Sequence, residues 1–406
     1  MRKFLIILLL LSLQGFAYSQ EATDTTDYNP EKLMLLGDEY RNQFEYSKAL
    51  FYYNSLLKRD SLNIKAMEYA SDMYSLLGEF GSSVKLLRKL NSIDTANIRL
   101  INKLALSLQS QQQPREAANI YRRLIKLSNA NFNTTKNLAD CYWLLGKRDS
   151  AEVYYKVADF INGKSLITKL NLSQIAYLNK DFSSSRIYAS RGVDLDSTYV
   201  PLRKQLGMVL YRMEEYKQAL NNFNFLIEKG DSSANILKYA GACNFFMGEF
   251  KSSIPLLRAT LELDSTDTEA MFYLGSSLSY NGEAEEASNI FNYLITLLQP
   301  DPDLLYKIYN QLGIAYSSLD KNRESYNYFA EAFKYNPTDI KLLFQMAMVK
   351  GGEKEKGSME MAKKLLEQYL EALKPKGSNL NPEEIILRER AKIYIEQINE
   401  DLFMSE

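Results

Sequence analysis

Residues 268–301 decide the fold, and they read TEAMFYLGSSLSYNGEAEEASNIFNYLITLLQPD. The stretch holds two runs in which apolar residues recur with the spacing of one face of an α-helix. The apolar positions are Met271, Leu274 and Leu278 in the first run and Ala287, Phe291 and Leu294 in the second. Because Asn281-Gly282 separates the runs, the stretch predicts two amphipathic helices joined by a short turn.

Small residues mark the same register through the rest of the chain. Walking back from Gly275 in steps of thirty-four residues reaches Gly241, Gly207, Ser173, Ala139, Ala105, Ser71 and Gly37. The same walk from Ala287 reaches Ser253, Ala219, Ser185, Ala151, Ala117, Ser83 and Ala49. Glycine inside a helix costs about 1 kcal/mol relative to alanine, so helix propensity does not explain the recurring glycines. Close approach of the two helices in each pair does explain them.

A thirty-four-residue unit of two helices resembles the tetratricopeptide repeat (TPR) family, whose pattern has a small residue after leucine in the first helix and alanine before an aromatic residue in the second. The residues that carry the resemblance are Leu36-Gly37, Tyr40, Ala49 and Tyr53; Leu206-Gly207, Ala219 and Phe223; Leu274-Gly275, Ala287 and Phe291; and Leu312-Gly313, Tyr316 and Phe329. The resemblance implies an all-α fold: a right-handed TPR superhelix, or α-solenoid, of about ten helix-turn-helix repeats.

The repeat frame divides the chain into segments. We expect a solenoid over residues 30–374, with repeats beginning near residues 30, 64, 98, 132, 166, 200, 234, 268, 306 and 340, and a C-terminal capping helix over residues 375–406. Four extra residues before residue 306 predict a longer connection or an altered twist there. In the last repeat, residues 350–358 predict an inter-helix turn longer than the others.

The first nineteen residues predict a signal peptide. Arg2-Lys3 precedes an apolar run over residues 4–13, and small residues stand at Ala17 and Ser19. The run is shorter than the about 20 residues that span a bilayer. We therefore expect cleavage before Gln20, a flexible leader over residues 20–29, and a periplasmic rather than secreted protein without a transmembrane segment. A buried N-terminal helix in a cytoplasmic protein is the other interpretation.

The composition argues against catalysis and metal binding. The chain has no histidine, which removes the commonest general base and metal ligand at neutral pH. Cys141 and Cys243 are three repeats apart at one repeat position, hence more than about 20 Å apart, too far for a disulfide or a shared zinc site. Basic and acidic residues number 49 and 50, which does not suggest a nucleic-acid partner. We expect no enzymatic activity, no cofactor and no metal.

Aromatic residues recur at the twelfth repeat position. Trp143, Tyr177, Tyr211 and Phe245 follow one another at thirty-four-residue spacing, and Phe246 and Tyr280 stand at the next position of their repeats. The TPR resemblance implies that these positions line a concave groove that holds ligands. It also places Lys136, Lys204 and Lys238 in the groove, with Asp38, Glu68 and Asp72 at its N-terminal end. The other interpretation is that the rings pack between repeats and belong to the core.

Six Asp-Ser or Asp-Thr pairs resemble the three-residue O-glycosylation signal of exported Bacteroidota proteins. The hydroxyl residues are Thr25, Ser61, Thr95, Ser150, Ser197 and Ser265. Capping of the turns between helices explains four of the pairs without a sugar.

These patterns favour a non-enzymatic periplasmic scaffold or adaptor. We expect protein or peptide partners in the concave groove, within a cell-envelope assembly. The alternative is a periplasmic carbohydrate-binding protein that stacks glycans on the aromatic row.

Overall fold

The structure is a computed structural model that describes residues 28–297, 301–377 and 379–404. The predicted signal peptide and residues 20–27 of the predicted leader lie outside these ranges. Within them the chain forms twenty-one α-helices, one short 3₁₀ helix and no strand, so the predicted all-α fold is confirmed.

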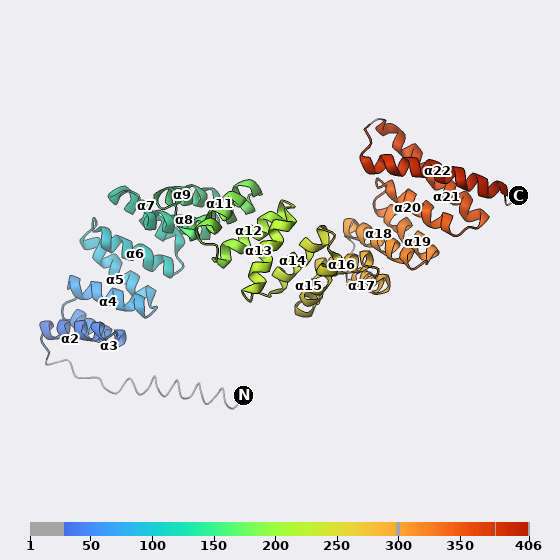
Figure 1. Cartoon of the computed structure of the whole chain (residues 1–406). Coiled ribbons are helices and arrows are strands. Elements are labelled where there is room, and N and C mark those ends of the chain that lie inside the picture. Colours follow the sequence, from blue (N-terminus) through green and yellow to red (C-terminus); the bar gives the residue numbers. More distant parts are fainter. Residues whose placement is uncertain (1–27, 298–300, 378, 405–406) are drawn as a thin grey trace, which may run out of the picture. The chain divides into compact units, whose positions relative to one another are not determined.

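The helices follow one another in pairs, and a short turn joins the two helices of each pair (Figure 1). The first helices of the pairs are α2 (Pro30–Asn42), α4 (Ile64–Leu76), α6 (Ile98–Ser110), α8 (Phe132–Leu144), α10 (Leu166–Leu178), α12 (Val200–Arg212), α14 (Ala234–Phe246), α16 (Thr268–Tyr280), α18 (Pro302–Ser318) and α20 (Lys341–Gly352). The second helices are α3 (Tyr46–Arg59), α5 (Phe80–Ile93), α7 (Pro114–Ser128), α9 (Arg148–Ile161), α11 (Phe182–Leu195), α13 (Tyr216–Glu228), α15 (Phe250–Leu263), α17 (Ala284–Leu297), α19 (Asn322–Tyr335) and α21 (Lys356–Leu373). The 3₁₀ helix η1 (Lys374–Lys376) and α22 (Pro382–Met404) end the chain.

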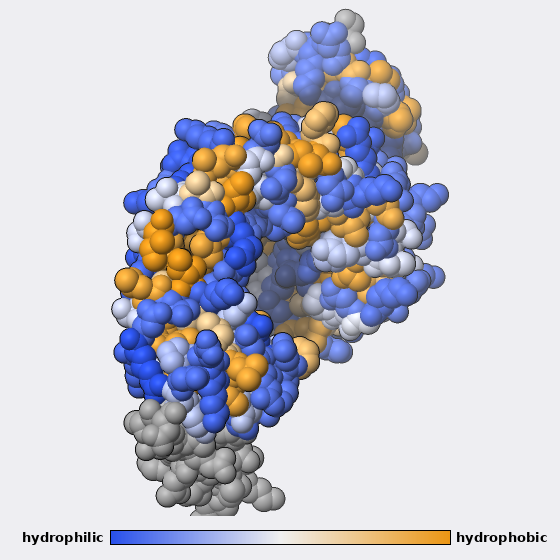
Figure 2. Space-filling model, turned by 90° about the vertical axis from the view of Figure 1, so that its left-hand side faces the viewer, coloured by the Kyte–Doolittle hydropathy of each residue, from blue (hydrophilic) through white to orange (hydrophobic). Residues whose placement is uncertain are grey.

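The helices belong to two compact units. One extends to Ile175 and the other covers Ala176–Glu406, with the boundary inside α10. On the face drawn in Figure 2, hydrophobic residues lie in separate patches between hydrophilic ones.

Polar residues at a fixed register start several of the first helices. The side chains of Asn29, Asn63, Asn97, Asn131 and Asp267 each accept a hydrogen bond from the backbone N–H three residues later. Such a cap satisfies one of the donors that a helix N-terminus leaves unpaired and stabilises the helix by about 1 kcal/mol. The caps therefore keep the helix starts in the repeat frame.

The glycine register is a packing requirement, as the sequence predicted. A Cβ atom placed on Gly275 would lie 2.8 Å from Cζ of Phe291, and one on Gly207 would lie 2.9 Å from Cε1 of Phe223. Atoms in real structures do not approach so closely. Each of these aromatic rings of the second helix thus packs against the first helix at the position where a side chain is missing.

Apolar residues of neighbouring repeats form continuous cores within each unit. In the first unit, one core joins residues of α4 to α8, including Leu87, Leu104 and Tyr121. In the second unit, another core joins residues of α15 to α18, including Phe291 and Leu312. Each repeat is buried by the next, which is how a solenoid stabilises a long chain without a single globular core.

The four extra residues before residue 306 lengthen a helix rather than a connection. α18 begins at Pro302, so residues 302–305 add a helical turn to the first helix of the ninth pair. Asp301 caps this turn, because its side chain accepts from the N–H of Asp303 at 3.1 Å. Proline is favourable in the first turn of a helix, where its missing N–H is not needed.

The long turn predicted over residues 350–358 is wrong. α20 continues to Gly352 and α21 begins at Lys356, which leaves a turn of residues 353–355. Gly351 lies within α20, and its missing side chain makes room for Tyr394 of α22, whose hydroxyl would lie 2.8 Å from a Cβ there. Glu353 holds the turn, since it accepts from Lys350 Nζ at 2.9 Å.

The last helix covers the end of the second unit. α22 buries Ala391 and Ile398 in the same core as Leu366 and Tyr369 of α21. Its other side chains are mostly exposed, as expected of a helix with one face toward solvent.

Candidate interaction surface

Aromatic side chains of the second unit form a connected group that continues through Phe223, Phe272 and Phe291, and eight of its members are here called the aromatic cluster. They come from five consecutive helices, α12 to α16, and each ring centroid lies within 6.2 Å of another. The members are Tyr211, Tyr216, Tyr239, Phe245, Phe246, Phe250, Tyr273 and Tyr280.

Short turns bring these rings together. Residues 213–215 connect α12 to α13, and residues 247–249 connect α14 to α15. The last turn of the first helix in each pair therefore lies beside the first turn of the second helix. Each turn needs a residue in the left-handed region, which is Glu214 (φ 61°) in the first and Gly248 (φ 78°) in the second. Glycine adopts this conformation without the steric cost that other residues meet.

Two members of the aromatic cluster face solvent. Phe246 is 43% exposed and Tyr280 is 49% exposed, whereas the other members are half-buried. Phe246 stacks on Tyr216 with centroids 4.7 Å apart and planes 12° apart. Tyr280 stacks on Phe250 at 4.8 Å and 18°. Each exposed ring is therefore held in place by a ring beneath it.

Polar groups within the aromatic cluster are paired with one another. The hydroxyls of Tyr211 and Tyr273 lie 3.3 Å apart, and burial raises the pKa of both. Lys238 Nζ lies 2.8 Å from Asp267 and 3.1 Å from Glu269. Burial lowers the pKa of Lys238, but its hydrogen bonds to the two carboxylates outweigh burial and raise the pKa overall. This ammonium is already neutralised by the next repeat.

The other predicted lysines also have acidic neighbours. Lys136 Nζ lies 2.7 Å from Asp140 on the same helix. Lys204 is half-buried, close enough to Asp231 to contribute to the lowered pKa of that carboxyl, after the hydrogen bonds from Ser233. An acidic partner is therefore not required to balance the positive charge of these lysines.

The predicted aromatic row is brought together only in part. Tyr211 and Phe245 belong to the aromatic cluster. Tyr177 contacts Phe182 edge-on at 5.5 Å, and its hydroxyl accepts from Arg212 Nε at 3.1 Å. Trp143 is half-buried on α8 in the first unit. All four rings of the row are half-buried, and ligand binding by them stays a prediction.

Sequence reasoning missed four members of the aromatic cluster. They are Tyr216, Tyr239, Phe250 and Tyr273. The signal was available: Tyr216 and Phe250 follow Phe182 at thirty-four-residue spacing, and Tyr239 and Tyr273 share a register of their own.

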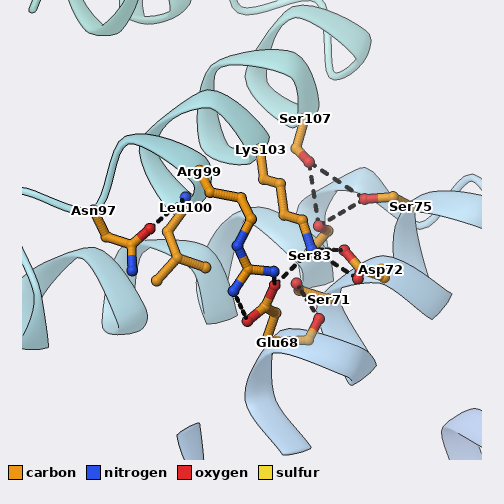
Figure 3. Close-up of polar contacts among 10 residues, drawn as sticks. All are labelled: Glu68, Ser71, Asp72, Ser75, Ser83, Asn97, Arg99, Leu100, Lys103 and Ser107. Atoms are coloured by element: carbon orange, nitrogen blue, oxygen red, sulfur yellow. Dashed lines mark hydrogen bonds and ion pairs between the residues drawn. The ribbon is translucent and has the colours of Figure 1, made fainter. Parts of the chain in front are cut away.

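Carboxylates of the predicted acidic end are paired as well. Glu68 accepts from Arg99 Nη2 at 2.7 Å and from Lys103 Nζ at 2.8 Å, and Lys103 also lies 2.8 Å from Asp72 (Figure 3). Burial raises the pKa of Glu68, but the hydrogen bonds from Lys103 and Arg99 outweigh it and lower the pKa overall. These contacts join α4 to α6, so this cluster holds two repeats together.

Asp38 is also engaged. Its carboxylate accepts from the hydroxyl of Tyr53 at 2.7 Å and lies 3.1 Å from Arg41. The N-terminal repeats therefore do not present the free acidic groove surface that the sequence suggested.

Four of the Asp-Ser and Asp-Thr pairs act as turn caps. The carboxylates of Asp60, Asp94, Asp196 and Asp264 each accept from the backbone N–H two residues later. Of the predicted hydroxyl sites, Ser61, Thr95, Ser197 and Ser265 are exposed, Ser150 is half-buried in the first turn of α9, and Thr25 lies outside the described residues. Glycosylation at these sites stays a prediction.

Within the described residues there is no group of three or more acidic or cysteine side chains placed to hold a metal ion. Cys141 and Cys243 form no disulfide, as predicted, and both are buried, which raises the pKa of each thiol to about 12. None of the described helices is long and apolar enough to cross a membrane.

Two separate stretches of the chain match family models of the tetratricopeptide repeat, residues 102–164 and residues 306–339. Both coincide with helix pairs that carry the repeat spacing described above. This chain is a TPR protein. The TPR fold generally serves as a scaffold for protein–protein interactions.

Relatives of this TPR protein are distant. It is 21% identical over 248 residues to the BBSome complex member BBS4 of Bos taurus, which covers 60% of this chain and 46% of that protein. It is 23% identical over 353 residues to the TPR repeat-containing protein MJ1428 of Methanocaldococcus jannaschii, and the match covers 82% of this chain and 57% of that protein. The chain thus spans about half the length of the curated relatives it matches.

Solved structures resemble the fold. One is a tetratricopeptide repeat protein from Parabacteroides merdae, with 15% identity, a TM-score of 0.43, and coverage of 62% of this chain and 98% of that one.

Proposed function

We propose that this TPR protein is a non-enzymatic scaffold that holds a protein or peptide partner on the aromatic cluster, within an envelope assembly of the periplasm. The observation that supports the proposal is the pair of exposed rings, Phe246 and Tyr280, each stacked on a fixed ring. Aromatic side chains held in this way lose little conformational entropy on binding and dominate the energy of many interfaces.

The chemistry of the aromatic cluster favours apolar anchors on the partner. Phe246 and Tyr280 offer ring surface, while Lys238 is neutralised by Asp267 and Glu269. A peptide or helix with leucine, methionine or aromatic side chains fits such a surface. One distant relative is a member of a protein complex by name, which agrees with a scaffold role.

Glycan binding, the alternative, is less favoured. Sugar recognition needs an open ring face together with hydrogen-bonding groups beside it. One face of each exposed ring is already stacked, and the charged groups nearby pair with one another.

Site-specific photocrosslinking tests the proposal. A benzoylphenylalanine residue would replace Tyr280 in one sample and Tyr293, an equally exposed tyrosine on α17 (54% exposed), in the control sample. After crosslinking in cells, the partner captured only from position 280 would be identified and purified. We expect the double change Phe246→Ala and Tyr280→Ala to weaken its binding by at least about tenfold, and Tyr293→Ala to leave it unchanged.

Two results would contradict the proposal. Equal capture from positions 280 and 293 would show that the aromatic cluster is not a specific site. A saccharide that raises the melting temperature of the wild type but not of the double variant would favour the glycan alternative.

A further inference from the structure

The second helices of the first three repeats carry positive charge that the balanced composition hides. α3, α5 and α7 together contain ten lysine and arginine residues and one acidic residue, Glu116. The six second helices from α11 to α21 contain ten basic and ten acidic residues. The excess is therefore particular to the N-terminal repeats and is not a general property of second helices in this chain.

Eight of these cations lie on one face of their helices, here called the basic face. They occupy repeat positions 18, 22, 25, 26 and 29, which follow the spacing of a single helical stripe. All are exposed except Arg123, which is half-buried. The members are Lys58, Lys85, Arg88, Lys89, Arg115, Arg122, Arg123 and Lys126.

Contacts within the chain do not neutralise the basic face. Arg88 pairs with Glu116 at 2.6 Å, and Glu116 is the one acidic residue that these three helices contain. Lys89 Nζ donates to the backbone carbonyl of Ser61 at 2.6 Å, and Arg123 donates to the carbonyl of Thr95. Carbonyl groups are uncharged, so these bonds fix the side chains against the preceding turns and leave the positive charge in place.

Helix stability explains only part of the excess. Cations in the last turn of a helix are favourable beside the negative end of its dipole. This applies to Lys58 of α3 and Lys126 of α7. Lys85, Arg88 and Arg122 lie farther from their helix ends and gain little from the dipole.

Aliphatic residues are exposed beside the cations at the same helix ends. Ile93 is 49% exposed and Leu127 is 47% exposed, and Leu62 in the turn after α3 is 64% exposed. Few aromatic rings of these helices are at the surface: Phe51 of α3 is 41% exposed, whereas Phe80 of α5 is half-buried and Tyr121 of α7 is buried. The basic face thus combines fixed cations with aliphatic contact points.

From this combination we propose that the basic face binds an acidic segment of a partner polypeptide that also carries aliphatic side chains. Carboxylates of the segment would pair with the lysines and arginines, and its apolar residues would contact Ile93 and Leu127. A single-stranded nucleic acid suits the face less well, because such ligands stack successive bases on several exposed aromatic rings and α3, α5 and α7 expose one ring, that of Phe51. The site lies in the first unit, apart from the aromatic cluster of the second, so it does not depend on the function proposed above.

Fluorescence anisotropy with the full chain tests this inference. The probe is a labelled twelve-residue peptide of glutamate with two leucines. The test variant replaces Lys85, Arg122 and Lys126 by glutamine, and the matched control replaces three exposed cations of other second helices, Arg191, Lys217 and Lys251, by glutamine. We expect about tenfold weaker binding for the test variant, less than twofold change for the control, and weaker binding of the wild type as salt is raised.

Several outcomes would overturn the proposal. They are no binding by the wild type, equal loss in both variants, and tighter binding of oligothymidine or of vesicles with anionic lipid that the test variant alone loses. Binding that appears only after Glu21, Asp24 and Asp27 are changed to amides would instead assign the basic face to the N-terminal segment of the chain itself. The glutamine variants change exposed side chains of the described helices. Circular dichroism melting would show that all variants remain folded.

Discussion

The hydroxyl oxygens of Tyr211 and Tyr273 lie 3.3 Å apart, although sixty-two residues separate the two tyrosines in the chain. Tyr211 is on α12 and Tyr273 on α16, so the hydrogen bond joins two first helices that are not neighbours in sequence. Tyr239 of α14 contacts the Tyr211 ring edge-on at 5.1 Å. The aromatic cluster thus couples three successive repeats as well as exposing two rings.

Replacing Tyr211 by phenylalanine removes this hydrogen bond and keeps the ring. We expect the free energy of unfolding to fall by about 1 kcal/mol, since that is the usual net value of one hydrogen bond. Tyr211→Ala should lower the free energy of unfolding by about 3 kcal/mol, because it also removes a half-buried ring. Urea unfolding followed by circular dichroism measures both. An unchanged midpoint for Tyr211→Phe would show that the hydroxyls do not stabilise the fold.

Gly275→Ala tests the glycine register. Alanine favours a helix by about 1 kcal/mol over glycine, yet the added Cβ would meet the Phe291 ring at 2.8 Å. Overpacking of this kind costs typically about 1–3 kcal/mol, so we expect a net loss of stability. Gly357→Ala is the control, because nothing lies within 4 Å of a Cβ there. It should leave stability unchanged or raise it by up to about 1 kcal/mol, and a stabilising Gly275→Ala would contradict the packing argument.

The two thiols should be inert in the folded protein. Burial raises the pKa of Cys141 and Cys243 to about 12, and the thiolate is the reactive form. At pH 8 we expect no reaction with Ellman's reagent until a denaturant unfolds the chain, after which two thiols react quickly. Rapid labelling of one thiol in native buffer would show that its repeat opens in solution.

Much of the fold could be predicted because its signals are local. The helix starts follow from caps such as Asn63 and Asn97, which act on backbone groups three residues away. The paired helices follow from small residues such as Gly275, which matter because of the ring packed against them. Both signals repeat along the chain, so each repeat supports the assignment of the others.

The candidate site was predicted less well, because it depends on contacts between repeats. Lys238 had the register of a ligand-binding lysine, but its partners Asp267 and Glu269 lie on the next repeat. The turn after α20 was expected to be long because of its glycines, whereas Gly351 makes room for Tyr394. A sequence pattern gives the position of a residue within its repeat but not the side chain that reaches it from another.

The ion pairs of Glu68 make a prediction about pH. The folded-state pKa of this carboxyl lies below its ordinary value of 4.5, because Lys103 and Arg99 hold its charged form despite burial. A lowered pKa means that the contribution to stability is fully present above pH 4.5 and is lost as the pH falls through the folded-state value.

At pH 7 we therefore expect Glu68→Gln to lower the free energy of unfolding by about 2 kcal/mol, the usual range for a hydrogen bond to a charged group. As the pH falls below 4.5, the difference between wild type and variant should shrink, because protonation of Glu68 removes the same charge. Urea unfolding at a series of pH values measures this, with the exposed Glu262→Gln as control. If the difference stayed constant down to pH 3, the carboxylate charge would not be what joins α4 to α6.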